Sequence, residues 1–250
     1  EINQESLSEK LYFFEKDNYT MSDQSGFADD FGRETQFFGA NSSLNARIKY
    51  LLPRRHTFGK MTMEVFDETG KSIVKLSPGK SKGMNFVTWN YRMSQPKVAK
   101  GKTLARGGLT SPRVKEGIYN IVINKGRDSF SKSIYVSDDP STNLDSNEKK
   151  LKYETTMKLY NLSEELAYVV YTIDEMLSSD TIKKGVKNKL QTIKESMVIT
   201  TGDNYVGTAE NELREDLLDL YSKLASSYDK PSQNDLDNLS IVQEEYNSLK

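Results

Sequence analysis

The sequence predicts a two-part protein, in which a β-sandwich is followed by an antiparallel α-helical bundle. Three observations carry this prediction. Between residues 44 and 137, apolar and polar residues alternate in short runs that are separated by turn residues, which is typical of a β-sandwich. After residue 138, the apolar spacing lengthens to three and four residues, as in amphipathic helices. Asp138-Asp139-Pro140 lies between the two patterns and marks the expected domain boundary.

Residues 1–43 are expected to be a leader, made of the end of an upstream domain and a linker. They contain one candidate short strand, Lys10–Glu15, followed by polar, turn-rich sequence. The chain begins at Glu1 without an initiator methionine or a signal peptide, so we expect a mature or excised fragment of a longer protein.

The β-sandwich is expected over residues 44–137. Gly70 suits a positive φ in the turn between the second and third strands, and Trp89 is the candidate core anchor because one indole ring buries a large apolar area. The predicted strands are 44–52, 61–65, 72–76, 83–91, 117–124 and 129–136.

The helical bundle is expected over residues 138–250, with short connections that imply antiparallel neighbours. Asp180 and Thr208 are expected to cap the second and third helices, and Pro231-Ser232 precedes the fourth. The residues expected to face inward on the first two helices are Leu159, Leu162, Leu166, Val169, Ile173 and Met176, then Ile182, Val186, Leu190, Ile193 and Met197. Those of the last two helices are Leu213, Leu217, Leu220 and Leu224, then Leu236, Leu239, Val242 and Tyr246.

Charge is distributed unevenly along the chain, although the net charge is only −1. Residues 1–44 carry 3 basic and 9 acidic side chains, residues 45–136 carry 19 and 5, and residues 137–250 carry 13 and 22. The basic middle segment suggests either a polyanion-binding surface or attraction to the acidic segments of the same chain, and the second interpretation is preferred. Base-stacking motifs are missing, so nucleic acid is not an expected partner. There is no cysteine, and no apolar run approaches the roughly 20 residues that span a bilayer.

A long basic loop at residues 93–115 is the best candidate for a binding site. It could meet an acidic glycan, a partner protein or the acidic helices of its own chain. Its candidate binding residues are Lys97, Lys100, Lys102, Arg106, Arg113 and Lys115. Gly101-Lys102-Thr103 lacks the spacing of a phosphate-binding loop, and Gly107-Gly108 is expected to make the loop flexible.

No catalytic, cofactor or metal site is expected. His56 is the only histidine and cannot form a multi-histidine metal site. The adjacent carboxylates Asp29-Asp30, Asp138-Asp139 and Glu164-Glu165 could in principle act in glycoside hydrolysis, but solvated surface charge is the preferred interpretation.

Three motifs resemble FlgD-type Ig-like modules: residues 65–76, Gly83–Asn90 and Glu116–Asn120. Asn90 stands where that pattern has Asp, and Glu116 stands where it has Pro. The wider order resembles the C-terminal region of Bacteroidota BNR-repeat or sortilin-like propeller proteins that are labelled glycosyl hydrolases. Matching motifs there are Phe38–Asn41, Ala46–Leu51, Ser137–Pro140, Gly202-Asp203 and Asp229–Ser232.

This resemblance implies an Ig-like sandwich with a helical tail, without catalytic residues of its own. The implied role is a scaffold in an exported, extracytoplasmic protein of the periplasm, the outer-membrane surface or the secreted fraction. The scaffold would position an upstream propeller or dock to an envelope or secretion partner. Two alternatives remain open, an accessory glycan-binding module and a chain that is itself an enzyme.

Overall fold

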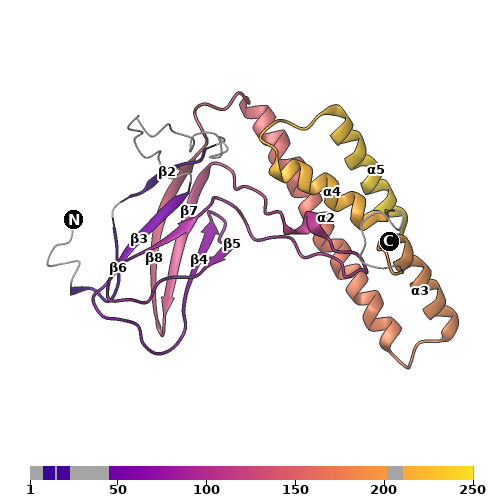
Figure 1. Cartoon of the computed structure of the whole chain (residues 1–250), viewed down its shortest axis with the longest axis horizontal. Coiled ribbons are helices and arrows are strands. Elements are labelled where there is room, and N and C mark those ends of the chain that lie inside the picture. The colour runs from indigo at the N-terminus through magenta and orange to yellow at the C-terminus, as the bar shows by residue number, and fades with distance from the viewer. Residues whose placement is uncertain (1–7, 15, 23–44, 202–210, 250) are drawn as a thin grey trace, which may run out of the picture. The chain divides into compact units, whose positions relative to one another are not determined.

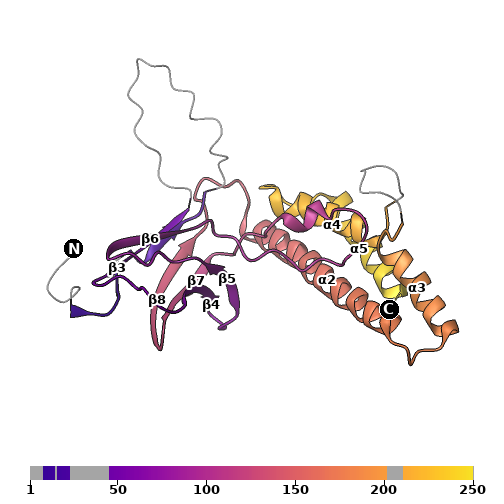
Figure 2. The ribbon, with the colours of Figure 1, turned by 60° about the horizontal axis from the view of Figure 1, so that its bottom comes forward.

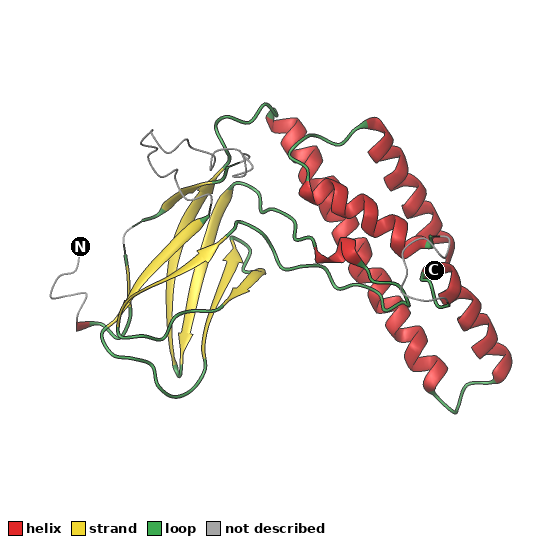
Figure 3. Ribbon diagram, in the orientation of Figure 1, coloured by secondary structure: helices red, strands yellow, loops and turns green. Residues whose placement is uncertain are grey.

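The structure is a computed structural model that describes residues 8–14, 16–22, 45–201 and 211–249. All described strands precede the four long helices in the chain (Figures 1 and 3). Contacts divide the chain into two units. The β unit comprises Glu1–Ser94 and Arg113–Asn143, and the helical unit comprises Gln95–Pro112 and Leu144–Lys250.

The β unit contains two open sheets (Figure 2). One has the strand order β1-β3-β6 and the other the order β2-β8-β7-β4-β5. All neighbouring strands are antiparallel except β2 and β8, which are parallel. The strands are β1 (Tyr12–Phe13), β2 (Asn18–Thr20), β3 (Ala46–Leu52), β4 (Met61–Asp67), β5 (Ser72–Leu76), β6 (Gly83–Trp89), β7 (Gly117–Lys125) and β8 (Asp128–Ser137).

Alternating apolar residues of both sheets form the core of the β unit. On β3 and β6, every second side chain is buried over most of the strand, as the period of two requires. Trp89 on β6 is 1% exposed, and its ring lies 5.4 Å from that of Tyr119 on β7. Its indole N–H donates to the Arg92 carbonyl at 3.0 Å, which satisfies the one polar atom of this side chain. Side chains of the two sheets therefore meet at Trp89.

The hairpin between β4 and β5 has a sequence-encoded turn. The Asp67 carboxylate accepts from the backbone N–H groups of Thr69 and Lys71 at 2.9 and 3.0 Å. Gly70 follows with φ of +82°, a conformation that glycine adopts without steric cost.

Strand β2 is not anticipated by the sequence analysis. It has three residues, of which only Tyr19 is buried, so it is too short to show an alternating pattern. Its pairing with β8 and the hydrogen bond from the Tyr19 hydroxyl to the Arg47 carbonyl, at 3.2 Å, are both long-range contacts.

The helical unit contains α2 (Ser146–Ser178), α3 (Lys184–Met197), α4 (Leu213–Ser226) and α5 (Gln233–Leu249), with a short 3₁₀ helix η1 (Arg106–Leu109). Helix α2 begins with a capping box. The Asp145 side chain accepts from the Glu148 backbone N–H at 2.8 Å, while the Glu148 carboxylate accepts from the Asp145 N–H at 3.1 Å.

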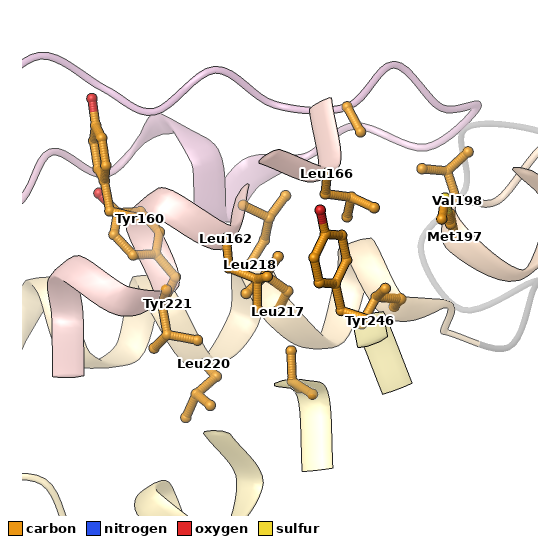
Figure 4. Close-up of a cluster of buried hydrophobic side chains, with 14 of the residues drawn as sticks. Tyr160, Leu162, Leu166, Met197, Val198, Leu217, Leu218, Leu220, Tyr221 and Tyr246 are labelled. Atoms are coloured by element: carbon orange, nitrogen blue, oxygen red, sulfur yellow. The ribbon is translucent and has the colours of Figure 1, made fainter. Parts of the chain in front are cut away.

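One apolar cluster joins the four helices (Figure 4). Leu217 and Tyr221 of α4 are fully buried within it, and the rings of Tyr160 and Tyr221 lie 6.3 Å apart. Leu166 of α2 and Tyr246 of α5 contribute from their own helices. Each of the four helices contacts the other three, and α4 is the helix that η1 packs against.

Several expectations for the helices are wrong in detail. On α2, Met176 is 41% exposed rather than inward-facing, and Val170, which was not expected, is fully buried; Val169 is half-buried and packs against the cluster as expected. A strict alternation of three and four residues corresponds to 3.5 residues per turn, whereas an α-helix has 3.6. Along a long helix, the buried face therefore drifts away from the expected stripe of residues. Asp180 does not cap α3, which begins four residues later, and Val186 is 48% exposed. The expected motifs Phe38–Asn41 and Gly202-Asp203 and the expected cap Thr208 lie outside the described residues.

Candidate functional site

The central part of the predicted binding loop belongs to the helical unit. We expected residues 93–115 to be a loop of the β domain, but Gln95–Pro112 packs with the helices. Backbone bonds hold it there: the Lys97 N–H donates to the Glu164 carboxylate at 3.3 Å, and the Lys102 N–H donates to the Ile199 carbonyl at 2.7 Å. At its other end, the Tyr221 hydroxyl donates to the Thr110 carbonyl at 2.9 Å.

Arg214, near the start of α4, anchors this segment. It is 2% exposed. Its guanidinium donates to the carbonyl oxygens of Ala99 at 3.0 Å and Thr103 at 3.2 Å, and to the Thr103 hydroxyl. The same group pairs with Glu215, whose carboxylate also accepts from the Thr103 hydroxyl at 2.8 Å. The buried charge is thus paired and hydrogen-bonded, as burial of an ion requires.

Three glycines allow the segment to approach the helices closely. A Cβ atom on Gly101 would overlap the Arg214 guanidinium, and one on Gly107 would overlap the Leu218 carbonyl. A Cβ on Gly108 would overlap the Val98 side chain. The expectation of a flexible Gly107-Gly108 loop is therefore wrong, because both residues are buried in η1. These glycines serve close backbone packing.

The six candidate binding residues are divided between the two units. Four belong to the helical unit and have exposed side chains: Lys97, Lys100, Lys102 and Arg106. The other two belong to the β unit. There, Arg113 donates to the Ser22 carbonyl, and the Lys115 ammonium lies 3.8 Å from the Glu68 carboxylate.

A groove of about 420 Å³ lies between α4 and α5 and was not anticipated. Its lining combines acidic and apolar side chains, namely Asp216, Asp219, Leu220, Lys223, Asp235, Asn238, Ile241 and Val242. Burial, reinforced by the nearby carboxylates Asp216 and Glu215, raises the pKa of Asp219. The Lys223 ammonium forms a salt bridge with the Asp235 carboxylate, with 2.6 Å between Nζ and Oδ1.

The adjacent carboxylates and the histidine take part in local structure. Asp139 is buried and accepts from the backbone N–H of Ser141 at 2.8 Å. Glu164 accepts from the Lys97 backbone and Glu165 accepts from the Tyr246 hydroxyl at 3.3 Å. His56 lies half-buried in the loop after β3, and its Nε2 atom is buried without a hydrogen-bond partner. Asp29-Asp30 lies outside the described residues.

Within the described ranges, no group of three or more His, Cys, Asp or Glu side chains is placed to hold a metal ion. Every described helix is too short or too polar to cross a lipid bilayer. No known protein family, curated protein or solved structure matches this chain.

The sequence analysis missed the role of Arg214. The only available signal was an arginine beside Leu213, at the start of the apolar stripe of α4. Its partners Ala99 and Thr103 lie more than 100 residues earlier in the chain, so no local pattern could have identified them.

Proposed function

We propose that this chain is a non-catalytic scaffold and interaction region of an exported, multidomain cell-envelope protein. It would position an upstream propeller domain or dock to an envelope or secretion-system partner. The observation that carries this proposal is the use of Gln95–Pro112, which lies between β6 and β7 in the chain, as a packing element of the helical unit anchored by Arg214. A segment whose backbone is tied to helices contributes to cohesion, whereas a mobile catalytic loop would need freedom to move.

The same proposal includes the finer fold, an Ig-like, FlgD-type β-sandwich followed by an antiparallel helical bundle. The alternating burial on β3 and β6 and the contact between Trp89 and Tyr119 support two sheets packed face to face. The chain passes between its two units three times, after Ser94, Pro112 and Asn143. Three covalent connections suit a scaffold, because each one limits the separation of the parts that it joins.

An accessory glycan-binding module of a carbohydrate-processing enzyme is the second candidate. It is favoured by the exposed side chains of Lys97, Lys100, Lys102 and Arg106, which lie on one segment. Such a surface would bind acidic glycans, and added salt would weaken the binding.

Two measurements on the whole chain test the proposal. We expect no release of chromophore from a panel of nitrophenyl glycosides, and turnover that co-purifies with the chain would overturn the non-catalytic assignment.

For the alternative, binding to polygalacturonate is compared between the wild type, K100E/K102E/R106E and the control K183E/K184E/K189E, which reverses the same number of charges on and beside α3. Binding that only the first variant loses would favour the glycan module over the scaffold.

A further inference from the structure

Two stretches of the β unit contain basic residues and no acidic ones. Residues 45–63 include Arg47, Lys49, Arg54, Arg55 and Lys60, without any Asp or Glu. Residues 77–94 include Lys80, Lys82 and Arg92, again without any acid. These stretches cover β3 and β6, which pair with each other, and the loops at the Leu52 and Gly83 ends of those strands.

The two loops at that end of the strand pair, residues 53–60 and 77–82, are bonded to each other. The His56 N–H donates to the Lys80 carbonyl at 3.0 Å, and the Lys80 ammonium donates to the Gly59 carbonyl at 3.2 Å. The cations of both loops therefore belong to one surface, which we call the basic tip.

Buried side chains hold the second loop in place. The hydroxyl of Tyr50 donates to the Gly79 carbonyl at 2.6 Å. The amide of Asn85, which is 8% exposed, donates to the carbonyls of Ser81 and Gly83 at 2.8 and 2.9 Å. A Cβ atom at Gly79 would lie 2.6 Å from the Asn85 Oδ1 atom, so only glycine fits this arrangement. The basic tip is thus preorganised and need not be ordered on binding.

An apolar side chain stands among these cations. Phe58 is 87% exposed, more than any other large apolar residue in the described part of the chain. Gly59 follows with φ of +87°, which makes the sharp turn at this point. Arg54, Arg55 and Lys82 are exposed, and none of the salt bridges between described residues involves them.

We propose that the basic tip binds the surface of an anionic lipid bilayer. Cations close to such a surface are attracted to its phosphate groups, and an aromatic ring at a loop tip enters the boundary between headgroups and acyl chains. A soluble polyanion would contact the cations but would leave Phe58 in water. The bilayer is the partner that uses both features of the tip, and the expected binding is peripheral and reversible.

The proposal deepens the envelope-docking role and rests on it for its setting, although the residues that carry it are separate from Gln95–Pro112. Each Lys or Arg near an anionic bilayer surface strengthens the affinity for that bilayer about fivefold. Removing two of them should weaken it about 25-fold, and removing a partly inserted Phe should weaken it about tenfold.

The test is sedimentation of the whole chain with vesicles of phosphatidylcholine, with and without phosphatidylglycerol. We expect binding only when phosphatidylglycerol is present, and a decrease as salt is added. R54Q/R55Q should bind about 25-fold more weakly and F58S about tenfold more weakly. The matched controls K183Q/K184Q and L104S should bind as the wild type does, since they remove the same charge and an exposed apolar side chain elsewhere.

We expect thermal unfolding of both tip variants to match that of the wild type, because the substituted side chains are exposed. Their weaker vesicle binding would then not be due to misfolding. Should a tip variant unfold early, F58Y, which retains an aromatic ring, and R54K/R55K, which retain the charges, should bind nearly as the wild type does. Absence of binding to phosphatidylglycerol vesicles would overturn the inference, as would binding that is insensitive to F58S and fully competed by soluble polygalacturonate. Either result leaves the scaffold proposal intact, because that proposal fails on glycoside turnover or on polygalacturonate binding that only K100E/K102E/R106E loses.

Discussion

The guanidinium of Arg214 can be buried because acceptors surround its five N–H donors. Two of those acceptors are carbonyls of Gln95–Pro112 and another is the Glu215 carboxylate. Glu215 depends on this partner, because its second oxygen is buried without a hydrogen bond. One side chain therefore connects a segment of the middle of the chain to a helix near its end.

We predict that Arg214→Met destabilises the helical unit by about 3–5 kcal/mol, because it removes the cation that pairs with the Glu215 carboxylate and the donor to two carbonyls. Urea unfolding followed by helical circular dichroism measures the change. Lys189→Met, at an exposed position of α3, is the control and should lie within about 0.5 kcal/mol of the wild type. A loss below about 1 kcal/mol for Arg214→Met would contradict the anchoring role.

Among the elements, α5 shows how a helix start is held. The Asp235 side chain is 4% exposed and accepts from the Ser232 N–H and hydroxyl at 3.0 and 2.7 Å, as well as from Lys223. Burial alone would raise the pKa of Asp235, but the hydrogen bonds from Lys223 and Ser232 outweigh it, so the pKa lies below the ordinary value of 3.8. The ionised form is therefore the stabilising one.

This direction of the pKa shift predicts the pH dependence of stability. Asp235 stabilises the fold above pH 3.8, and that contribution is lost as the pH falls through the lower pKa of the folded state. Asp235→Asn should cost about 2 kcal/mol at neutral pH. The difference between wild type and variant should shrink below pH 3.8. Chemical unfolding of both proteins from pH 7 downward checks this, and a constant difference at every pH would contradict it.

At the scale of the whole molecule, the helical unit is discontinuous in sequence. A fragment cut at the boundary that the sequence suggests, residues 138–250, contains all four long helices but lacks Gln95–Pro112. It would expose the surface of α4 that η1 covers and leave Arg214 without two of its acceptors.

We predict that fragment 138–250 unfolds at a lower temperature than the helices of the whole chain, and that a synthetic peptide of residues 95–112 restores stability when added in trans. Thermal unfolding at rising peptide concentration measures this, because a ligand of the folded state raises its stability. A peptide with Gly107→Val should fail, since its side chain would meet the Leu218 carbonyl. Equal effects of the two peptides would refute the packing role.

The local parts of this fold could be predicted from the sequence. The alternation in 46–52 and 83–89 and the three- and four-residue spacing around Leu159 and Leu166 depend only on the geometry of a strand or a helix. The end of the buried stripe on α2 and the start of α3 were missed, because drift of the helix and the real cap position depend on the neighbouring helices.

By itself, the sequence determined where the longer strands and helices lie, because backbone geometry imposes a repeat on their side chains, whereas the short β2 and η1 carry no such repeat. Only the tertiary structure decided where the basic segment Gln95–Pro112 belongs. Its position depends on the room left by Gly101 and Gly107 and on the acceptors offered to Arg214 from more than 100 residues away. Such contacts leave no periodic signal, because the residues that make them become neighbours only when the chain is folded.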